Sequence, residues 1–227
     1  MRFLPVLLLL AACADPDPLA TDATGTDTAT PDSAAVSVLP VTADEAAASA
    51  LSVGDRAPDF ALPNASGGTT RLSELLLDGP VVLTFYRGAW CPYCNTQLRD
   101  YQQALGRFEE VGAQLVAVSP QRPDSSMTAA ERNDLAFPVL SDVGNTVSQD
   151  YGLVFRVDDE TRQRYAAVGL DLEQYNGSEG AAGGWALPVP ATYVIDRSGT
   201  VRAAFVEADY TRRASTRDLF DALNALT

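Results

Sequence analysis

The sequence predicts an α/β protein, a sandwich in which helices flank a central mixed β-sheet. Short apolar runs rich in β-branched residues alternate with segments of helical spacing, and the chain closes with two strand-like runs and a helix. A chain of 227 residues with 46% hydrophobic composition is long enough for one well-buried domain and a tail. We therefore expect one folded domain over residues 53–227.

The first thirteen residues, MRFLPVLLLLAAC, have a positive start, a short apolar stretch and small residues before a cysteine. The stretch is too short for a membrane-spanning helix, which needs about 20 apolar residues, and has the plan of a secretory signal. Residues 10–13 resemble the lipobox of bacterial lipoproteins, which implies lipidation of Cys13. We expect residues 1–12 to be a signal peptide and the chain to be an extracytoplasmic, membrane-anchored lipoprotein of the bacterial periplasm or cell envelope. The alternatives are an ordinary cleaved signal and an unprocessed start.

Residues 13–52 follow the apolar stretch and differ sharply from it in composition. From Ala14 onward they are rich in Ala, Thr, Asp and Pro, carry seven acids and no base, and contain no aromatic residue. Such a segment buries too little apolar surface to offset the entropy of ordering it. We expect a disordered acidic linker, placed in a compartment that permits disulfides.

The first elements of the domain are predicted from apolar spacing. The run VVLTFY, residues 81–86, is short, β-branched and aromatic, as in a buried strand. A helix follows, because the next apolar side chains are spaced 4, 3, 4 and 3 and so share one helical face. These side chains are Cys94, Leu98, Tyr101, Leu105 and Phe108.

Turn signals and apolar runs place the remaining elements. Residues 113–120 read as a second strand after Gly112, and Thr128 with Glu131 offers a capping box for a further helix. A short strand near 137–140 and a helix near 146–152 come next. Two strands on either side of an RSG turn and a last helix from about Ser215 end the chain. The strands are residues 191–196 and 201–208.

Composition excludes several kinds of function. The formal net charge is −14, so a polyanionic partner is repelled and we expect no nucleic-acid binding. The chain has no His, the commonest general base and transition-metal ligand. Catalysis must then rest on Cys, Tyr, Arg or carboxylates.

Two of the three cysteines lie at the predicted junction of strand and helix. Cys91 falls near the helix N-cap and Cys94 one turn inside, with Pro92 at the first helical position. Unpaired N–H groups and a positive partial charge at a helix N-terminus stabilise a thiolate. At this spacing the Cα atoms can approach within the distance of about 4.4 to 6.8 Å that a disulfide requires. The pair is therefore predicted to cycle between dithiol and disulfide.

Three other interpretations of the pair are weaker. A structural disulfide closing so short a loop would remove little chain entropy. A zinc site would have only carboxylates to complete it, since there is no His and no second cysteine pair. Inert buried cysteines are the third alternative. We expect redox chemistry with no cofactor and no metal.

Three stretches of the sequence carry a resemblance to a known family. VGDRAPDFALPNASGGTTRLSELLLDGPVVLTFYRG, LAFPVLSDVGNTVSQDYGL and VPATYVIDRSGTVRAAFVEADYTRR resemble the peroxiredoxin-like branch of the alkyl hydroperoxide reductase and thiol-specific antioxidant (AhpC/TSA) family. The resemblance spans about residues 53–213 and implies a thioredoxin-like fold. WCPYC adds a thioredoxin-like Trp90 and the Pro-Tyr pair typical of glutaredoxins, a CPYC motif. Pro190 matches the cis-proline that faces the Cys-x-x-Cys motif in thioredoxin-fold proteins.

The sequence departs from the peroxiredoxin pattern at the activating positions. Alignment of FY puts Cys94 at the peroxidatic position, Arg87 in place of a Pro and Cys91 in place of a Thr. Alignment of VID puts Pro190 where an Arg is expected. Arg87 could still supply a cation near the thiolate. Arg212 and Arg213 could hold an anion, but we expect them to form a solvated surface pair.

The two templates assign opposite roles to the cysteines. Helical periodicity leaves Cys91 at the more open tip, as in thioredoxins, where the first cysteine attacks disulfides. The peroxiredoxin alignment makes Cys94 the attacking thiol. For attack on disulfides we favour Cys91, and the thiol that attacks peroxide stays open.

The resemblance implies a thiol-dependent antioxidant oxidoreductase that reduces hydroperoxides through a Cys91–Cys94 dithiol/disulfide cycle. Its partners would be a hydroperoxide or disulfide substrate, an external thiol reductant such as a thioredoxin-like protein, and the membrane through a lipid anchor. The residues alone support dithiol exchange. The alternatives are a thiol-disulfide oxidoreductase for extracytoplasmic protein disulfides and a non-catalytic redox-sensing or binding module.

Overall fold

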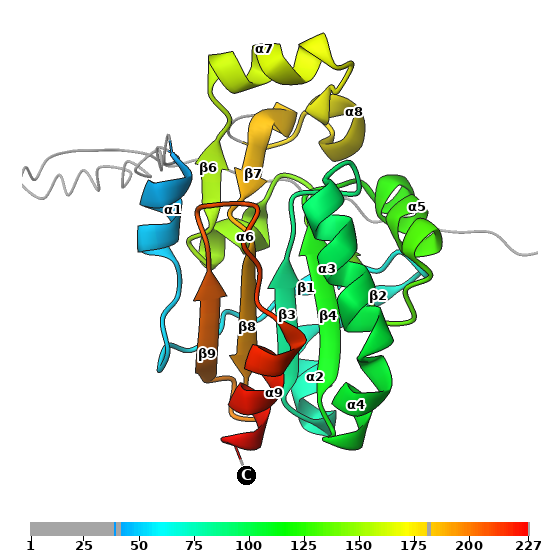
Figure 1. Cartoon of the computed structure of the whole chain (residues 1–227), viewed down its shortest axis with the longest axis vertical. Helices are drawn as coiled ribbons and strands as arrows, with labels where there is room; N and C mark the ends of the chain where they lie inside the picture. The colour runs from blue at the N-terminus through cyan, green and yellow to red at the C-terminus, as the bar shows by residue number, and fades with distance from the viewer. Residues whose placement is uncertain (1–38, 40–41, 181–182, 227) are drawn as a thin grey trace, which may run out of the picture. The chain divides into compact units, whose positions relative to one another are not determined.

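A five-stranded mixed sheet lies at the centre of the fold, in the order β5-β4-β3-β8-β9 (Figure 1). The computed structural model describes residues 39, 42–180 and 183–226. Strand β3 pairs in parallel with β4 and antiparallel with β8; β4 and β5 are parallel, and β8 and β9 antiparallel. The mixed sheet predicted from the sequence is confirmed. The strands are β3 (Val81–Phe85), β4 (Gln114–Ser119), β5 (Val139–Ser141), β8 (Ala191–Ile195) and β9 (Val201–Val206).

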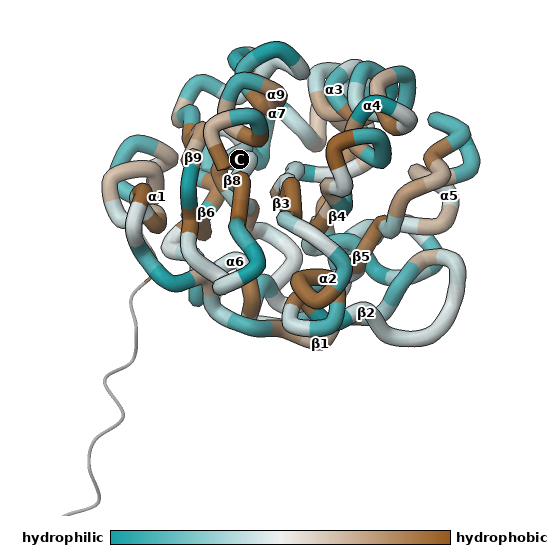
Figure 2. The backbone as a smooth tube through the Cα atoms, turned by 90° about the horizontal axis from the view of Figure 1, so that it is seen from below, coloured by the Kyte–Doolittle hydropathy of each residue, from teal (hydrophilic) through white to brown (hydrophobic). Residues whose placement is uncertain are grey.

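Alternate side chains of β3 build the two halves of the core. Val81, Leu83 and Phe85 face one layer, whereas Val82 and the following Tyr86 face the other. Helices cover both faces of the sheet, with α2 and α6 on one side and α3, α4 and α9 on the other (Figure 2). The helices are α2 (Leu72–Asp78), α3 (Pro92–Gln103), α4 (Leu105–Glu110), α6 (Thr146–Asp150) and α9 (Thr216–Asn224).

Smaller elements surround this sandwich. Strands β1 and β2 form an antiparallel pair, and α5 lies beside β5 at one edge of the sheet (Figure 1). Between α6 and β8 the chain makes an excursion in which β6 and β7 pair and α7 and α8 connect them. The elements are β1 (Ala61–Pro63), β2 (Thr69–Arg71), α5 (Pro123–Asn133), β6 (Val154–Arg156), α7 (Asp159–Ala167), α8 (Leu172–Asn176), the 3-10 turn η1 (Gly183–Trp185) and β7 (Ala186–Pro188).

The folded part begins earlier than the predicted boundary at residue 53. Helix α1 (Ala43–Ser49) lies inside the range predicted as linker. Thr42 and Glu45 close a capping box at its start, and Ala46 is fully buried. Because the composition argument averaged over the whole segment, it missed this one short helix. The predicted signal peptide, Cys13 and most of the linker lie outside the described residues.

Two predicted helices have different limits from those expected. The helix assigned to the Thr128 capping box starts at Pro123, whose ring favours the first helical position, and Thr128 donates instead to the Asp124 carbonyl at 3.0 Å. The periodic helix over 94–108 is interrupted at Ala104, with φ −94° and ψ 0°, and becomes α3 and α4. Its predicted inward side chains are nevertheless buried or half-buried.

The excursion was not predicted at all. None of the residues of α7 is buried, so the helix has no apolar stripe from which to recognise it. Strands β6 and β7 have three residues each, which is too few for period-two alternation to stand out. This excursion nevertheless carries a residue to the cysteine site.

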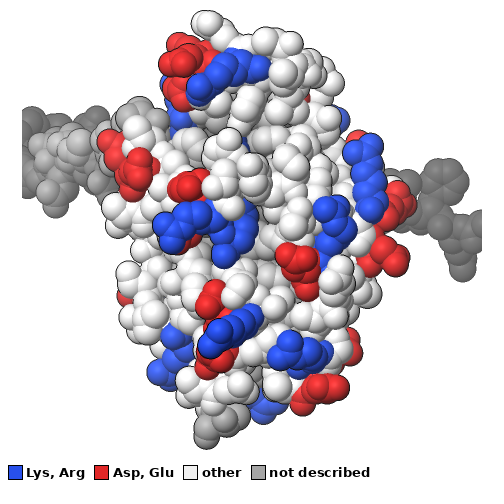
Figure 3. Space-filling view, viewed as in Figure 1, with Lys and Arg blue, Asp and Glu red and all other residues white. Residues whose placement is uncertain are grey.

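Charges of both signs are interspersed on the face shown in Figure 3, where arginines and acidic side chains lie close to one another. Exposed pairs of this kind include Arg212 with Glu207 at 3.3 Å and Arg164 with Glu160 at 3.5 Å. The acidity of the chain is thus not gathered on this face. Within the described ranges, no helix has the length and apolar character needed to cross a membrane.

Candidate active site

A tightly held loop leads from the end of β3 to the two cysteines. Gly88 has φ +149°, and a Cβ added there would lie 2.5 Å from Trp90 Nε1, so only glycine fits. The Ala89 N–H donates to Gln121 Oε1 at 2.7 Å, and Asn95 Nδ2 donates to the Ala89 carbonyl at 2.8 Å. These contacts fix the direction in which the chain enters α3.

The cysteines lie at the helix start that the sequence predicted. Cys91 is the N-cap of α3, Pro92 is its first residue, and Cys94 follows one turn later. Both are free thiols, with exposed fractions of 2% and 0%. The expectation that Cys91 occupies an open tip is wrong, because it belongs to the same buried cluster as Cys94 and Tyr86.

The surroundings of the two thiols move their pKa values in opposite directions. The pKa of Cys94 is lowered overall, although burial alone would raise it. It is lowered by hydrogen bonds from the Cys91 thiol, the Arg213 guanidinium and the Arg87 backbone N–H, and by the charge of Arg213. The pKa of Cys91 is raised, because its proton is held in the hydrogen bond to Cys94 and because the thiol is buried. Of the two thiols, Cys94 is therefore the more readily ionised, and it holds the position that the peroxiredoxin alignment favoured.

Arg213 supplies the cation at this thiolate. Its Nη2 lies 3.5 Å from Cys94 Sγ, and its Nη1 donates to the backbone carbonyls of Tyr210 and Arg212. The residue comes from the connection between β9 and α9, which folds back over the start of α3. Arg213 is thus not half of a solvated surface pair, as the sequence led us to expect, whereas Arg212 is exposed and pairs with Glu207.

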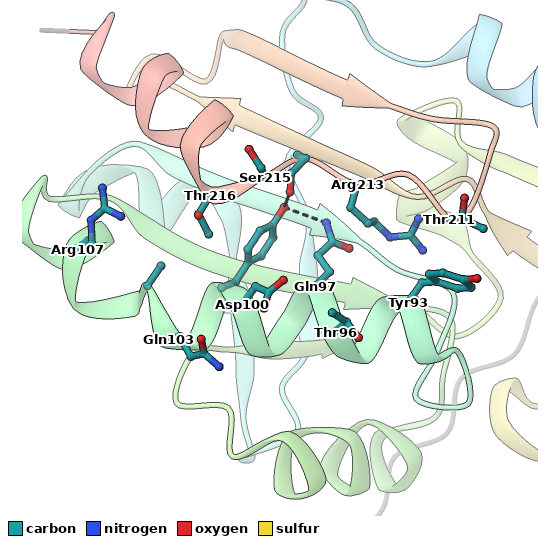
Figure 4. A pocket seen from close by; sticks show the side chains of 13 residues that line it. Tyr93, Thr96, Gln97, Asp100, Gln103, Arg107, Thr211, Arg213, Ser215 and Thr216 are labelled. Atoms are coloured by element: carbon teal, nitrogen blue, oxygen red, sulfur yellow. Dashed lines mark hydrogen bonds between the residues drawn. The ribbon is translucent and has the colours of Figure 1, made fainter.

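A polar network ties the Arg213 segment to α3. Gln97 Nε2 donates to the Tyr101 hydroxyl at 2.9 Å, and this hydroxyl donates to the Ala214 carbonyl at 3.0 Å (Figure 4). Gln97 is 4% exposed, and its Oε1 has no hydrogen-bond partner among the described residues. The side chain therefore has an unused acceptor on the buried face of α3, three residues after Cys94.

A groove of about 710 Å³ opens beside this network, between α3 and residues 211–216. Figure 4 shows Gln97 and Arg213 side by side on its wall, with Tyr93 at the end where α3 begins. Arg213, which contacts Cys94, lines the groove, and the groove is large enough to admit a small substrate.

Arg87 and Trp90 lie together on the other side of the cysteines. The Arg87 guanidinium is 5.0 Å from the Trp90 ring centroid and 4.5 Å from that of Tyr210, and it donates to the Tyr165 hydroxyl of α7. The charge of Arg87 works to lower the pKa of Cys91, although the hydrogen bond to Cys94 and burial raise that pKa overall. The side chain that contacts the Cys94 sulfur is nevertheless Arg213.

Pro190 connects β7 to β8 and lines a small space together with Gln97, Thr192 and Arg213. It therefore lies beside the thiolate environment, as the thioredoxin-fold resemblance implies. The cis form of the Val189–Pro190 bond stays a prediction. In the part of the chain that the structure describes, no group of three or more Cys, Asp or Glu side chains is arranged to hold a metal ion.

Comparison with known proteins decides the family. A model of the AhpC/TSA family matches residues 53–204, the greater part of the domain. The chain belongs to the AhpC/TSA family. The family match includes β3, α3, Cys91 and Cys94 but ends before Arg213.

Relatives within the AhpC/TSA family include peroxiredoxins. Rv1608c of Mycobacterium tuberculosis, a protein named as a peroxiredoxin, is 38% identical over 105 residues, 45% of this chain and 67% of that protein. Chloroplastic peroxiredoxin Q of Populus jackii is 32% identical over 152 residues, 67% of this chain and 59% of the relative. The chain thus matches about two thirds or less of these relatives' own length.

Solved structures show the same fold. The crystal structure of peroxidoxin BcpB from Mycobacterium tuberculosis superposes with a TM-score of 0.59 at 28% identity, covering 78% of this chain and 96% of that one. Reduced 2-Cys peroxiredoxin of Plasmodium vivax gives a TM-score of 0.59 at 18% identity, covering 77% and 81%. The thioredoxin-like sandwich implied by the sequence is confirmed.

Three residues of the site escaped the sequence reasoning: Gln97, Tyr165 and Tyr210. Arg213 was considered as a holder of an anion but was assigned to a solvated surface pair, so its contact with Cys94 was missed. Gln97 could have been found from the helical spacing, since a polar side chain three residues after Cys94 falls on the buried face of the helix. No pattern in the sequence marks Tyr165 or Tyr210, because the fold brings them to Arg87 from α7 and from the connection after β9.

Proposed function

We propose that this AhpC/TSA protein is a thiol peroxidase in which Cys94 attacks hydroperoxides and Cys91 resolves the product. The observation that carries the proposal is the contact between Arg213 and Cys94, together with the lowered pKa of Cys94. A thiolate, and not a thiol, is the nucleophile in such reactions. The family and its peroxiredoxin relatives support a hydroperoxide as the substrate.

In the first step the Cys94 thiolate attacks one oxygen of the O–O bond. A sulfur–oxygen bond forms and the O–O bond breaks, which leaves a sulfenic acid on Cys94. The second oxygen leaves as an alkoxide or hydroxide and takes a proton from solvent, so the product is an alcohol, or water when the substrate is hydrogen peroxide. The Arg213 guanidinium can stabilise charge that develops on the oxygens, and Gln97 Oε1 can accept the hydrogen bond of the peroxide O–H.

In the second step the Cys91 sulfur attacks the sulfenic acid on Cys94. The sulfur–oxygen bond breaks, water leaves, and a Cys91–Cys94 disulfide forms. The spacing of the two residues supports this step, because Cys91 is the N-cap of α3 and Cys94 follows one turn later, and each thiol affects the pKa of the other. An external thiol reductant, such as a thioredoxin-like protein, would return the disulfide to the dithiol.

Single-turnover reactions of the full chain test these roles. The prereduced protein is mixed with hydroperoxide and the remaining peroxide is measured for the native chain, Cys91→Ser and Cys94→Ser. We expect Cys94→Ser to consume none. Cys91→Ser should consume one equivalent and retain a sulfenic acid that a dimedone probe labels. Consumption by Cys94→Ser but not by Cys91→Ser would reverse the roles, and consumption by neither the native chain nor a variant would overturn the proposal.

A second candidate is a thiol-disulfide oxidoreductase that acts on extracytoplasmic protein disulfides. It is favoured by Cys91 as the N-cap of α3 and by Pro190 on the wall beside the pair. Measuring the reduction of insulin disulfides by the native chain, Cys91→Ser and Cys94→Ser distinguishes this function from that of a thiol peroxidase. If neither hydroperoxide nor insulin is turned over, a non-catalytic redox-sensing or binding module becomes the leading function.

We also propose that the chain acts outside the cytoplasm, tethered through lipid on Cys13. The support is the sequence MRFLPVLLLLAAC alone. Metabolic labelling with a radioactive fatty acid in a bacterial host should mark the native chain and not Cys13→Ser. Equal labelling of both, or of neither, would refute the anchor.

A further inference from the structure

A second cavity, of about 590 Å³, lies on the Arg87 side of the cysteine pair. Its walls are mainly aromatic and apolar, formed by Phe155 of β6, the following Val157, Tyr165 of α7, and Pro190 and Tyr210. A cavity of this size and lining suits a small organic molecule with an apolar body. Nothing in the proposed peroxide chemistry uses it.

Arg87 gives this cavity a buried cation without an anion. The residue is 5% exposed, Nη2 is held by Tyr165, and Nε has no hydrogen-bond partner within the described ranges. No carboxylate of the described residues lies within ion-pair distance of it. A buried guanidinium is costly unless a charge of opposite sign joins it.

The other charged groups of the cavity are already engaged. Arg164 pairs with Glu160 at 3.5 Å. The Asp158 carboxylate accepts from the Thr161 N–H and hydroxyl, each at 2.8 Å. Arg87 is therefore the group to which an incoming carboxylate would bind.

Two side chains that line the cavity act on Cys91. Arg87 acts electrostatically on Cys91, and Tyr165 is likewise close enough to Cys91 for their charges to interact. Arg213 and the groove along α3 lie at Cys94. The two cavities are thus lined by side chains that act on different cysteines.

We propose that the cavity beside Arg87 binds a small organic thiol bearing a carboxylate, which reduces the Cys91–Cys94 disulfide. The proposal rests on the disulfide cycle proposed above and names the class of its reductant. Arg87 binds the carboxylate, the aromatic walls hold the body, and the thiol is directed at Cys91.

The reaction balances with two thiol molecules. The first thiolate attacks Cys91 Sγ, the Cys91–Cys94 bond breaks, and Cys94 leaves as a thiolate, so a mixed disulfide joins the reductant to Cys91. A second thiolate attacks the reductant sulfur of that bond, releases the symmetrical disulfide, and leaves Cys91 to take up a proton. The thiol of lower pKa leaves faster, which favours Cys94 as the leaving group.

The test needs no peroxide. The full chain carrying Cys13→Ser is oxidised with diamide and mixed with 4-(mercaptomethyl)benzoate or its neutral amide, which have the same body and thiol. Free Cys91 and Cys94 are trapped with N-ethylmaleimide and counted by mass spectrometry over time. We expect the carboxylate to react at least tenfold faster than the amide and to saturate. Because oxidation is chemical, the result does not depend on peroxidase activity.

Variants then identify the site. Arg87→Gln should bring the rates of the carboxylate thiol and the amide thiol to within about twofold of each other. Ala208→Asp adds a carboxylate to the cavity wall and removes no contact of Arg87, so it should slow the reaction of the carboxylate thiol and not that of the amide thiol. Arg217→Gln, an exposed arginine of α9, should keep the preference. If Arg87→Gln does not fold, the rates of Ala208→Asp with the carboxylate thiol and the amide thiol decide the question.

Equal rates with the two thiols in the native chain would overturn the proposal. A preference that survives in Ala208→Asp and in a folded Arg87→Gln would also overturn it. A third refuting result would be an effect of these variants confined to carboxylate-bearing hydroperoxides, because the cavity would then bind the oxidant.

Discussion

Arg213 Nη2 lies 3.5 Å from Cys94 Sγ, although 119 positions separate the two residues in the sequence. One partner comes from the start of α3 and the other from the connection that leads into the last helix. The contact places a permanent positive charge beside a buried sulfur, where it is weakly screened by solvent.

Replacement of Arg213 by Gln should therefore raise the pKa of Cys94 and shrink the thiolate fraction at neutral pH. Alkylation of Cys94 by iodoacetamide at pH 7, read by mass spectrometry, should slow several-fold. Arg212→Gln removes an exposed arginine that pairs with Glu207 and should leave the rate unchanged. Equal slowing in both variants would mean that general surface charge, and not the contact, sets reactivity.

The pH dependence of stability gives a second prediction. Because the folded state lowers the pKa of Cys94, ionisation of this thiol should contribute stability in full above the ordinary thiol pKa. The contribution should be lost as the pH falls through the folded pKa. Urea unfolding of the reduced native chain and of Cys94→Ser at several pH values measures it. The stability difference between the two proteins should grow with pH over this range; a constant or shrinking difference would contradict the assignment.

The Tyr101 hydroxyl links Gln97 to the Ala214 carbonyl, next to Arg213. Tyr101→Phe should cost about 1–3 kcal/mol, because both partners lose a buried hydrogen bond. It should also slow alkylation of Cys94, since the segment that carries Arg213 is held less firmly. Tyr93→Phe changes an exposed tyrosine and should change neither the stability nor the rate of Cys94 alkylation. Lost stability with unchanged alkylation would limit the network to a structural role.

Gly88 provides a backbone test of the loop before the cysteines. Gly88→Ala should destabilise the protein by about 1–3 kcal/mol, because alanine is strained at φ +149° and its Cβ would meet Trp90. Gly106→Ala is the matched control, a helical position with open space around it, where alanine should stabilise by about 0.5–1 kcal/mol. Urea unfolding of the two variants should give changes of opposite sign.

The sandwich and the place of the cysteines could be predicted from the sequence because both depend on local patterns. The run at 81–86 is apolar on both faces, as a central strand requires, and the spacing from Cys94 to Phe108 follows the helical period. The start of α3 follows from Pro92, which suits the first helical turn. Each of these signals lies within about twenty residues.

The charge at Cys94 could not be predicted in the same way. Alignment at the end of the domain places Pro190 where the family pattern has an arginine, while the arginine that reaches the sulfur stands later, in a connection with no periodicity. Tyr165 reaches Arg87 from α7, a helix with no buried residue. Contacts of this kind depend on how connections fold back, which apolar spacing does not record.

Strand β3 sends Leu83 into one half of the core and Val82 into the other, and it delivers the chain directly to Arg87 and Cys91. Losing or gaining one residue inside this strand would exchange the two rows of side chains and turn the cysteine loop to the wrong layer. Variation in length among proteins built on this plan should therefore accumulate in the connections, such as the excursion that holds α7. The strand itself should keep a constant number of residues.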